Sequence, residues 1–182
     1  MSLCVAPALW AEGPPVPRHA PEFVLQFNDG SEKLLSSYRG SVVAIEFLHT
    51  TCMHCQNAAK LFSKLNAEYG VKGFKPLGVA WNEMAKMLVP DFIKLYGVNY
   101  PVAYSEREKV LDFLQYSVMQ RVVVPQIVWI DRKGMIRSQT NADAGGEEMR
   151  QEPYWREMIV KLTSETDGAG KKTSAATKRA AK

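Results

Sequence analysis

Residues 41–81 read SVVAIEFLHTTCMHCQNAAKLFSKLNAEYGVKGFKPLGVAW, and they predict a strand, a helix and a second strand in that order. The run 41–48 is almost continuously apolar and rich in β-branched residues, which is typical of a central strand buried on both faces. Apolar residues then recur on one helical face until Gly70, a helix stop signal. The run 74–81 is apolar again. This order indicates a parallel crossover unit.

The segments on either side extend this unit into an α/β domain. Phe23–Phe27 alternates apolar and polar residues and precedes the turn Asn28-Asp29-Gly30, so we expect an N-terminal β-hairpin. Downstream we expect a second helix with Pro90 at its first position and Gly97 at its end. The remaining expected elements are an extended piece over 98–104, a helix over 108–116, a strand over 122–130, a return strand over 135–140 and a last helix over 153–163.

Length and composition favour one globular domain. The chain has 182 residues, of which 46% are apolar and 23% charged. Its net charge is +4, but residues 164–182 hold five basic and two acidic residues, so most of that charge lies at one end. We therefore expect a disordered basic tail over 164–182, a domain over 20–163, and no nucleic-acid binding.

The first residues suggest export. Leu3–Ala11 is a short apolar stretch that includes Ala6-Pro7-Ala8, which resembles the end of a bacterial secretory signal. The positive start of such a signal is missing, so we interpret residues 1–19 as a truncated signal remnant and an extended lead-in. Cys4 then belongs to the discarded part. Periplasmic or otherwise exported location is expected, without an integral membrane span, because no apolar run is long enough.

Two cysteines, Cys52 and Cys55, follow the first buried strand directly, where a helix begins. A helix N-terminus has free N–H groups and partial positive charge, and both favour a thiolate. Cys52 at that terminus is expected to be exposed and to attack substrate disulfides. Cys55, one turn deeper, is expected to resolve the mixed disulfide.

Other readings of these cysteines are a structural disulfide or a zinc site. His49, Cys52, His54 and Cys55 are four possible ligands, but tetrahedral sites normally draw on two separate chain segments. We therefore predict no metal and no cofactor.

Three further residues are candidates for roles beside the cysteines. Glu46 lies in the buried strand, where an unpaired carboxylate is costly, and it is a candidate acceptor for the Cys55 proton. The alternative is that Glu46 points to an edge and meets Lys or Arg. His54 is a candidate for tuning the Cys52 thiolate. Pro125 precedes an apolar strand, and a cis bond after Val124 or a plain trans proline both fit that position.

The chain resembles the thioredoxin superfamily, and within it the TlpA/ResA-like, AhpC/TSA-related branch of exported bacterial thiol–disulfide oxidoreductases. The matching motifs lie between Ala20 and about Ala142: residues 20–25 (APEFVL), 28–30 (NDG), 38–43 (YRGSVV), 52–55 (CMHC), 97–102 (GVNYPV), 124–125 (VP) and 130–134 (IDRKG). The resemblance implies a thioredoxin-like fold, a central mixed sheet flanked by helices with an N-terminal hairpin extension. It also implies that Pro125 is cis and faces the cysteines, that the Val124 backbone helps to hold the substrate chain, and that Glu46 occupies the superfamily's buried acid position. His54 looks like the histidine in the Cys-Pro-His-Cys motif of dithiol oxidases.

The chain departs from that branch at several positions. Thr51 replaces the usual Trp before the first cysteine, and Met53-His54 replaces an interior that usually contains Pro. Ala58 and Lys60 stand where the branch often has an acid and a proline. These departures weaken any transfer of the branch's role in cytochrome c maturation, and they leave the redox chemistry intact.

The sequence thus predicts a monomeric enzyme that exchanges disulfides with protein thiols and with an upstream redox partner. One alternative is a non-enzymatic thioredoxin-like binding domain with an inert disulfide. A peroxiredoxin-like peroxidase is another, but its motif requires Pro and Thr or Ser where this chain has Ile45 and His49. The direction of electron flow is open, because His54 favours an oxidant and the resemblance favours a reductase.

Overall fold

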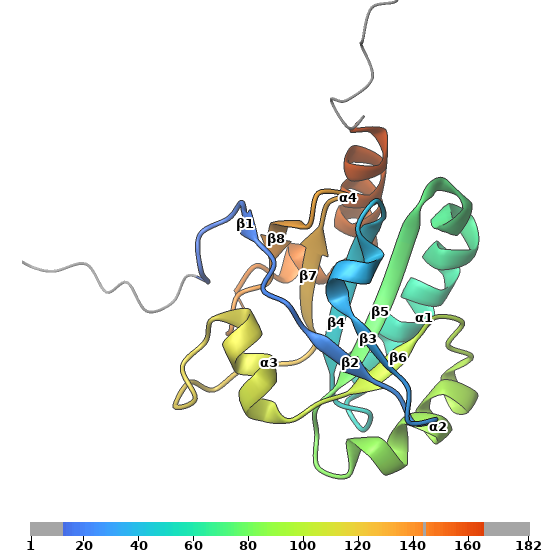
Figure 1. The fold of residues 1–182 in the computed structure, drawn as a ribbon, viewed down its shortest axis with the longest axis vertical. Helices are drawn as coiled ribbons and strands as arrows, with labels where there is room; N and C mark the ends of the chain where they lie inside the picture. The colour runs from blue at the N-terminus through green and yellow to red at the C-terminus, as the bar shows by residue number, and fades with distance from the viewer. Residues whose placement is uncertain (1–12, 144, 166–182) are drawn as a thin grey trace, which may run out of the picture.

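The computed structural model describes residues 13–143 and 145–165, and in this part of the chain helices cover both faces of one mixed β-sheet (Figure 1). The sheet has eight strands in the order β1-β8-β7-β4-β5-β6-β2-β3. The strands are β1 Arg18–His19, β2 Val24–Gln26, β3 Glu32–Leu34, β4 Val42–Leu48, β5 Phe74–Ala80, β6 Val102–Tyr104, β7 Gln126–Ile130 and β8 Met135–Gln139. The α-helices are α1 Met53–Tyr69, α2 Ala85–Tyr96, α3 Arg107–Leu114 and α4 Glu152–Ser164, with short 3-10 helices η1 Leu35–Tyr38, η2 Gly70–Lys72 and η3 Glu147–Arg150.

Strand β4 is the centre of the sheet. It pairs in parallel with β5 and antiparallel with β7, and all seven of its residues are buried. The parallel crossover from β4 through α1 to β5 is therefore confirmed. Burial on both faces explains why this strand reads as a continuous apolar run and does not alternate.

Successive residues of β4 point into two different cores. Val42, Ala44 and Leu48 pack with α1, α2 and α4, whereas Val43, Ile45 and Phe47 pack with α3 and the N-terminal strands. This alternation follows from the two-residue period of a strand. Glu46 therefore shares the face of Ala44 and Leu48, on which α1 also lies.

The predicted N-terminal hairpin is confirmed. β2 and β3 pair antiparallel, and Gln26 pairs with Tyr104 of β6, so the hairpin extends the sheet beyond β6. At the opposite edge of the sheet β1 pairs with β8. Strand β1 ends just before residue 20, where the domain was predicted to start. The thioredoxin-like α/β fold class is confirmed as predicted.

The position predicted for Pro90 is wrong. Helix α2 begins at Ala85, so Pro90 lies inside it. Proline has no N–H, and the carbonyl of Lys86, four residues earlier, loses its helical partner. The side-chain amide of Asn28, in the turn between β2 and β3, donates to that carbonyl instead. This long-range contact supplies the hydrogen bond that the helix lacks.

The signal remnant, Cys4 and nearly all of the predicted basic tail lie outside the described residues. Of the predicted tail only Ser164 and Glu165 are described, and Glu165 accepts hydrogen bonds from Arg137 at 2.7 and 3.1 Å. The domain limits therefore remain predictions. Among the helices of the described part, none combines the length and the hydrophobicity needed to cross a bilayer.

Candidate active site

Cys52 is the N-cap residue of α1. Its carbonyl accepts the first helical bond from the Gln56 N–H at 3.0 Å, and its own N–H donates to the His49 carbonyl at 3.1 Å. No side chain caps this helix end. The N–H groups of the first turn of α1 are therefore left without a side-chain cap next to Cys52.

The two thiols have different surroundings. Neither sulfur is in a disulfide in this structure, and Cys52 is half-buried while Cys55 is completely buried. Burial first, and the nearby Glu46 charge second, raise the pKa of Cys55 far above that of a free thiol. Cys55 consequently stays protonated until a base accepts its proton.

Glu46 lies close enough to Cys55 for its charge to raise the pKa of that thiol. It is 0% exposed, and its Oε2 accepts a hydrogen bond from the Tyr100 hydroxyl at 3.3 Å. Its Oε1 has no partner among the described residues, and no Lys or Arg bonds to it there. Burial raises the pKa of Glu46 well above its ordinary value, and the Cys52 charge adds to the rise. Glu46 is therefore not the edge residue paired with a cation that we considered as an alternative.

Val124 lies beside the first cysteine. The Cys52 Sγ is 3.9 Å from the Val124 carbonyl oxygen, and the Val124–Pro125 peptide bond is cis. The structure thus brings Cys52, Cys55, Glu46, Val124 and Pro125 together at the carboxyl end of β4.

A groove of about 550 Å³ opens next to this cluster. Its lining includes His54, Leu61, Val124, Pro125, Arg150 and Trp155. His54 is exposed in the first turn of α1, so its ring faces the groove and the solvent. A concave surface of apolar side chains with a few polar groups is typical of a ligand-binding site.

Arg150 holds the segment around Pro125 in place. Its Nε donates to the Pro125 carbonyl at 3.4 Å, and its other nitrogens donate to the carbonyls of Gly145, Asn141 and Asp143 at 3.0, 3.0 and 3.1 Å. One side chain therefore joins the loop after β8 to the loop before β7.

Gln126, the first residue of β7, adds to this connection. Its Nε2 donates to the carbonyls of Val123 and Asn141 at 2.8 and 2.9 Å, while its Oε1 accepts from Thr140 at 2.8 Å. Arg150 and Gln126 were not predicted from the sequence, because nothing near them in the sequence shows that they meet Pro125.

His49 takes no direct part in this cluster through its side chain. Its ring packs edge-on against Trp81 with centroids 4.6 Å apart, and burial lowers the pKa of His49. Within the described residues no group of three or more His, Cys, Asp or Glu side chains is arranged to hold a metal ion. His49 and His54 thus do not form a zinc site with the two cysteines in this structure.

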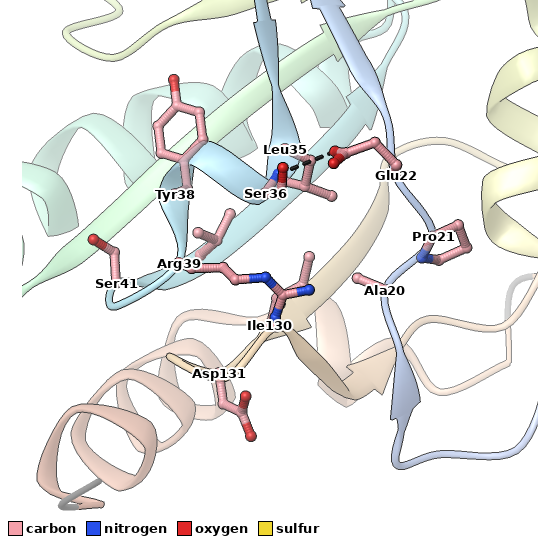
Figure 2. Close-up of a pocket in the computed structure, with 12 residues that line it drawn as sticks. Ala20, Pro21, Glu22, Leu35, Ser36, Tyr38, Arg39, Ser41, Ile130 and Asp131 are labelled. Atoms are coloured by element: carbon pink, nitrogen blue, oxygen red, sulfur yellow. Dashed lines mark hydrogen bonds between the residues drawn. The ribbon is translucent and has the colours of Figure 1, made fainter.

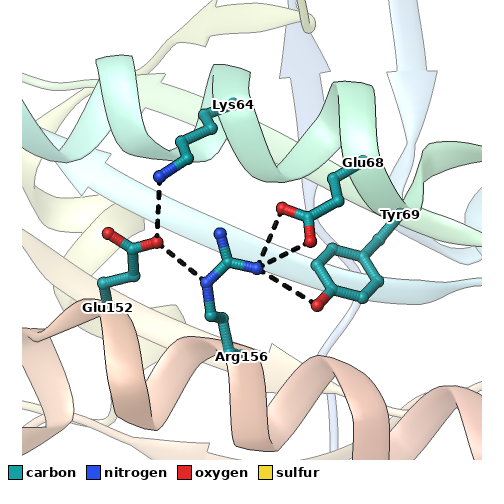
Figure 3. A network of polar contacts seen from close by, with 5 residues as sticks. All are labelled: Lys64, Glu68, Tyr69, Glu152 and Arg156. Carbon is teal, nitrogen blue, oxygen red and sulfur yellow. Dashed lines mark hydrogen bonds and ion pairs between the residues drawn. The ribbon is translucent and has the colours of Figure 1, made fainter.

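Helix α4 contributes Trp155 to the groove lining, and a network of polar contacts docks this helix on α1 (Figure 3). Arg156 donates to Glu68 and Glu152 at 2.8 Å each, and Lys64 also reaches Glu152 at 3.2 Å. Below this network the Trp155 ring stacks on Phe62 with centroids 4.2 Å apart. These contacts fix the wall that Trp155 contributes to the groove.

A smaller cavity, of about 100 Å³, lies at the opposite end of the sheet (Figure 2). It is lined by Ser41 and Val43 at the start of β4, whereas the cysteines follow the end of that strand. The Glu22 carboxylate, which lines it, accepts the N–H of Ser36 at 3.0 Å and so anchors η1 to the segment that precedes β2. This cavity is therefore separate from the thiols.

This fold, with a Cys-x-x-Cys pair between a buried strand and a helix, defines a thioredoxin-like protein. A family model described as the AhpC/TSA family matches residues 16–139, and the chain belongs to that family.

The thiol-disulfide oxidoreductase ResA of Geobacillus thermodenitrificans is 28% identical over 132 residues, which cover 72% of each chain. ResA of Bacillus subtilis is 32% identical over 98 residues, or 54% of each chain.

Solved structures agree on the fold. A thiol:disulfide interchange protein of the thioredoxin family from Chlorobium tepidum superimposes with a TM-score of 0.67 at 22% identity, covering 82% of this chain and 99% of that one. A secreted disulfide oxidoreductase of Mycobacterium tuberculosis superimposes with a TM-score of 0.61 at 14% identity, covering 77% and 96%. At these identities the likeness concerns the fold.

Proposed function

We propose that this protein is a thiol–disulfide oxidoreductase that exchanges disulfides with protein substrates through Cys52 and Cys55. The observation that carries the proposal is the asymmetry of the pair. Cys52 is accessible at an uncapped helix N-terminus, while Cys55 is completely buried one turn deeper with a carboxylate nearby. The ResA relatives carry the same activity in their names.

The chemistry follows from this asymmetry. In the reducing direction the Cys52 thiolate attacks one sulfur of a substrate disulfide, and the other substrate sulfur leaves as a thiolate and is protonated from water. Cys55 then loses its proton to Glu46, and its sulfur bonds to Cys52 Sγ as the mixed disulfide breaks. The substrate gains two electrons and the cysteine pair loses them. The oxidising direction reverses these steps.

We propose that the groove beside Cys52 holds the substrate chain. The Val124 backbone lies next to the attacking sulfur, so its carbonyl is placed to bond an extended segment whose disulfide faces Cys52. Leu61, which is partly exposed on the wall of the groove, offers apolar surface to neighbouring side chains of that segment. The substrate is therefore a polypeptide rather than a small thiol.

Export fits this chemistry, because disulfides persist outside the cytosol. The secreted relative from Mycobacterium tuberculosis and the apolar start of the sequence support a periplasmic or otherwise exported location. An upstream redox partner then restores the cysteine pair after each turnover. A monomer is enough for this cycle, since every proposed group comes from one chain.

Reduction of insulin disulfides by a dithiol tests the proposal. The wild-type chain is expected to accelerate the reaction, and Cys52→Ser to abolish the acceleration. Cys4→Ser is the matched control, because Cys4 lies outside the proposed pair and its loss should leave the rate unchanged. Full activity in Cys52→Ser would contradict the function and leave the inert-disulfide binding domain as the better reading.

A further inference from the structure

Among the described residues, Tyr100 is the one that hydrogen-bonds the Glu46 side chain. The disulfide-exchange steps proposed above do not use this residue. Its hydroxyl bonds Glu46 Oε2, while Oε1 stays without a partner in the described part of the chain. Both residues are buried, Tyr100 at 6% exposure and Glu46 at 0%. A buried hydroxyl on one oxygen of an otherwise unpaired carboxylate controls how that carboxylate is oriented.

The hydroxyl is held in place from two directions. The preceding residue, Asn99, donates its N–H to Ser63 Oγ at 3.4 Å and its side-chain amide to the Ser63 carbonyl at 3.0 Å, and Asn66 donates to Asn99 Oδ1 at 3.1 Å. The Tyr100 ring itself meets Phe62 edge-on, with centroids 6.3 Å apart and planes at 79°. Helix α1, whose N-cap residue is Cys52 and which contains Cys55, thus also holds Tyr100 in place.

We propose that Tyr100 is a positioning residue of the disulfide exchange. It bonds Glu46 Oε2 and so leaves Oε1 as the oxygen that receives the Cys55 proton. The inference rests on the oxidoreductase function proposed above. Tyr100 donates its hydrogen bond throughout and neither gains nor loses a proton, whereas the Cys55 proton moves to Glu46 as the sulfur attacks.

The groups around Glu46 determine the effect of removing the hydroxyl. The titratable groups that face it are Tyr100, Cys52 and Cys55, and in the described part of the chain none of its contacts is a cation. Among the described residues, the Tyr100 hydrogen bond is thus the one interaction that favours the ionised carboxylate. Without it the pKa of Glu46 rises further, and a higher pH is needed before Glu46 accepts a proton.

In a Cys4→Ser background, the resolving step can be measured by itself with 5,5′-dithiobis(2-nitrobenzoate). Attack by Cys52 releases one coloured thiolate, and attack by Cys55 on the resulting mixed disulfide releases a second. In the wild type the rate of the second release should rise with pH as Glu46 ionises. Tyr100→Phe keeps the ring against Phe62. This variant is expected to move the rise in rate to higher pH by about one unit, so at pH values below the rise the second release should be about tenfold slower than in the wild type.

Three comparisons make this test specific. Tyr96→Phe, the matched loss of a hydroxyl from a partly buried tyrosine on α2, should leave the pH profile unchanged. Glu46→Gln should abolish the rise, and Tyr100→Phe should then have no further effect in the Glu46→Gln background. Replacement of Tyr100 by 3-fluorotyrosine, a stronger donor of the same shape, should move the rise to lower pH. This last variant also serves if Tyr100→Phe folds poorly.

The inference is overturned if the wild type and Tyr100→Phe share one pH profile, if the shift persists in the Glu46→Gln background, or if Glu46→Gln leaves the profile unchanged. Failure of the proposed function looks different. In that case the wild type releases no second thiolate, or Cys52→Ser releases as much as the wild type does.

Discussion

The sulfur of Cys52 lies 3.9 Å from the carbonyl oxygen of Val124, a residue that follows it by 72 positions in the chain. This contact joins the helix that activates the thiol to the loop proposed to hold the substrate. The loop in turn depends on Arg150 and Gln126, whose hydrogen bonds cross between the segments before β7 and after β8. Reactivity and substrate binding are therefore supported by different residues.

Arg150→Gln is expected to separate these two properties. The variant loses most of the hydrogen bonds to the carbonyls of Pro125, Gly145, Asn141 and Asp143, so the loop should loosen and the KM for a protein substrate should rise severalfold. The free energy of unfolding should fall by about 1–2 kcal/mol. Alkylation of Cys52 by iodoacetamide should keep its wild-type rate.

The matched control for this variant is Arg107→Gln. Arg107 also donates to two backbone carbonyls, those of Val118 and Gln120, and these residues do not line the groove. If both variants raise KM equally, Arg150 acts only through general stability and not through the loop.

The buried and the accessible thiol should differ in how readily iodoacetamide alkylates them in the folded protein. Cys52 is half-buried and Cys55 is 0% exposed with a raised pKa, so in a Cys4→Ser background the reduced protein should accept one iodoacetamide, on Cys52. Denaturation should expose the second thiol. Peptide mapping by mass spectrometry gives the modified residue, and rapid native labelling of Cys55 would contradict the assigned roles.

Glu46 should lower the stability of the fold as the pH rises. Its pKa is higher in the folded than in the unfolded chain, so the folded state binds more protons between these two values. Its stabilising contribution is thus complete below the unfolded pKa and is lost as the pH rises through the folded pKa.

Glu46→Gln removes this dependence. At about pH 8 the variant should exceed the wild type in free energy of unfolding by on the order of 1 kcal/mol, although it resolves mixed disulfides more slowly. Urea unfolding across a range of pH measures the difference. The opposite result would be a wild-type free energy of unfolding that rises with pH through neutrality, relative to that of Glu46→Gln. It would show that the pKa of Glu46 is not held above its ordinary value.

His54 should set the reduction potential. Its ring is exposed in the first turn of α1, where an N–H donor stabilises the Cys52 thiolate and hence the reduced form. We predict a potential above the thioredoxin value of about −270 mV, and a decrease of about 30 mV for a tenfold loss of this stabilisation in His54→Ala.

Equilibration with glutathione measures both potentials, and His19→Ala, on the edge strand β1, is the matched control. A wild-type potential at or below the thioredoxin value would remove the argument from His54.

Much of the fold follows from local pattern. The apolar run of β4, the helix over Met53–Tyr69 and the turn between β2 and β3 were predictable, because burial on both faces, helical periodicity and turn residues leave direct marks in the sequence. The cysteine pair was predictable for the same reason. Its place between a buried strand and a helix is a feature of neighbouring residues.

Other features depend on contacts between distant residues. Pro90 lies within α2 because Asn28, 62 positions earlier, comes from another turn to bond the Lys86 carbonyl next to it. Tyr100 reaches Glu46 across 54 positions, and Arg150 reaches Pro125 across 25. No periodicity or motif encodes such meetings, so these contacts of Asn28, Tyr100 and Arg150 were identified only in the structure.

The most direct test of the central claim is to trap the mixed disulfide. In a Cys4→Ser background, Cys55→Ser should trap a disulfide-containing protein such as insulin as a mixed disulfide with Cys52. Reduction by a dithiol should release the trapped protein. Cys52→Ser should trap none, because its remaining thiol is buried. Peptide mapping that finds the adduct on Cys52 supports the account; equal trapping by Cys52→Ser, or an adduct on Cys55, would contradict it.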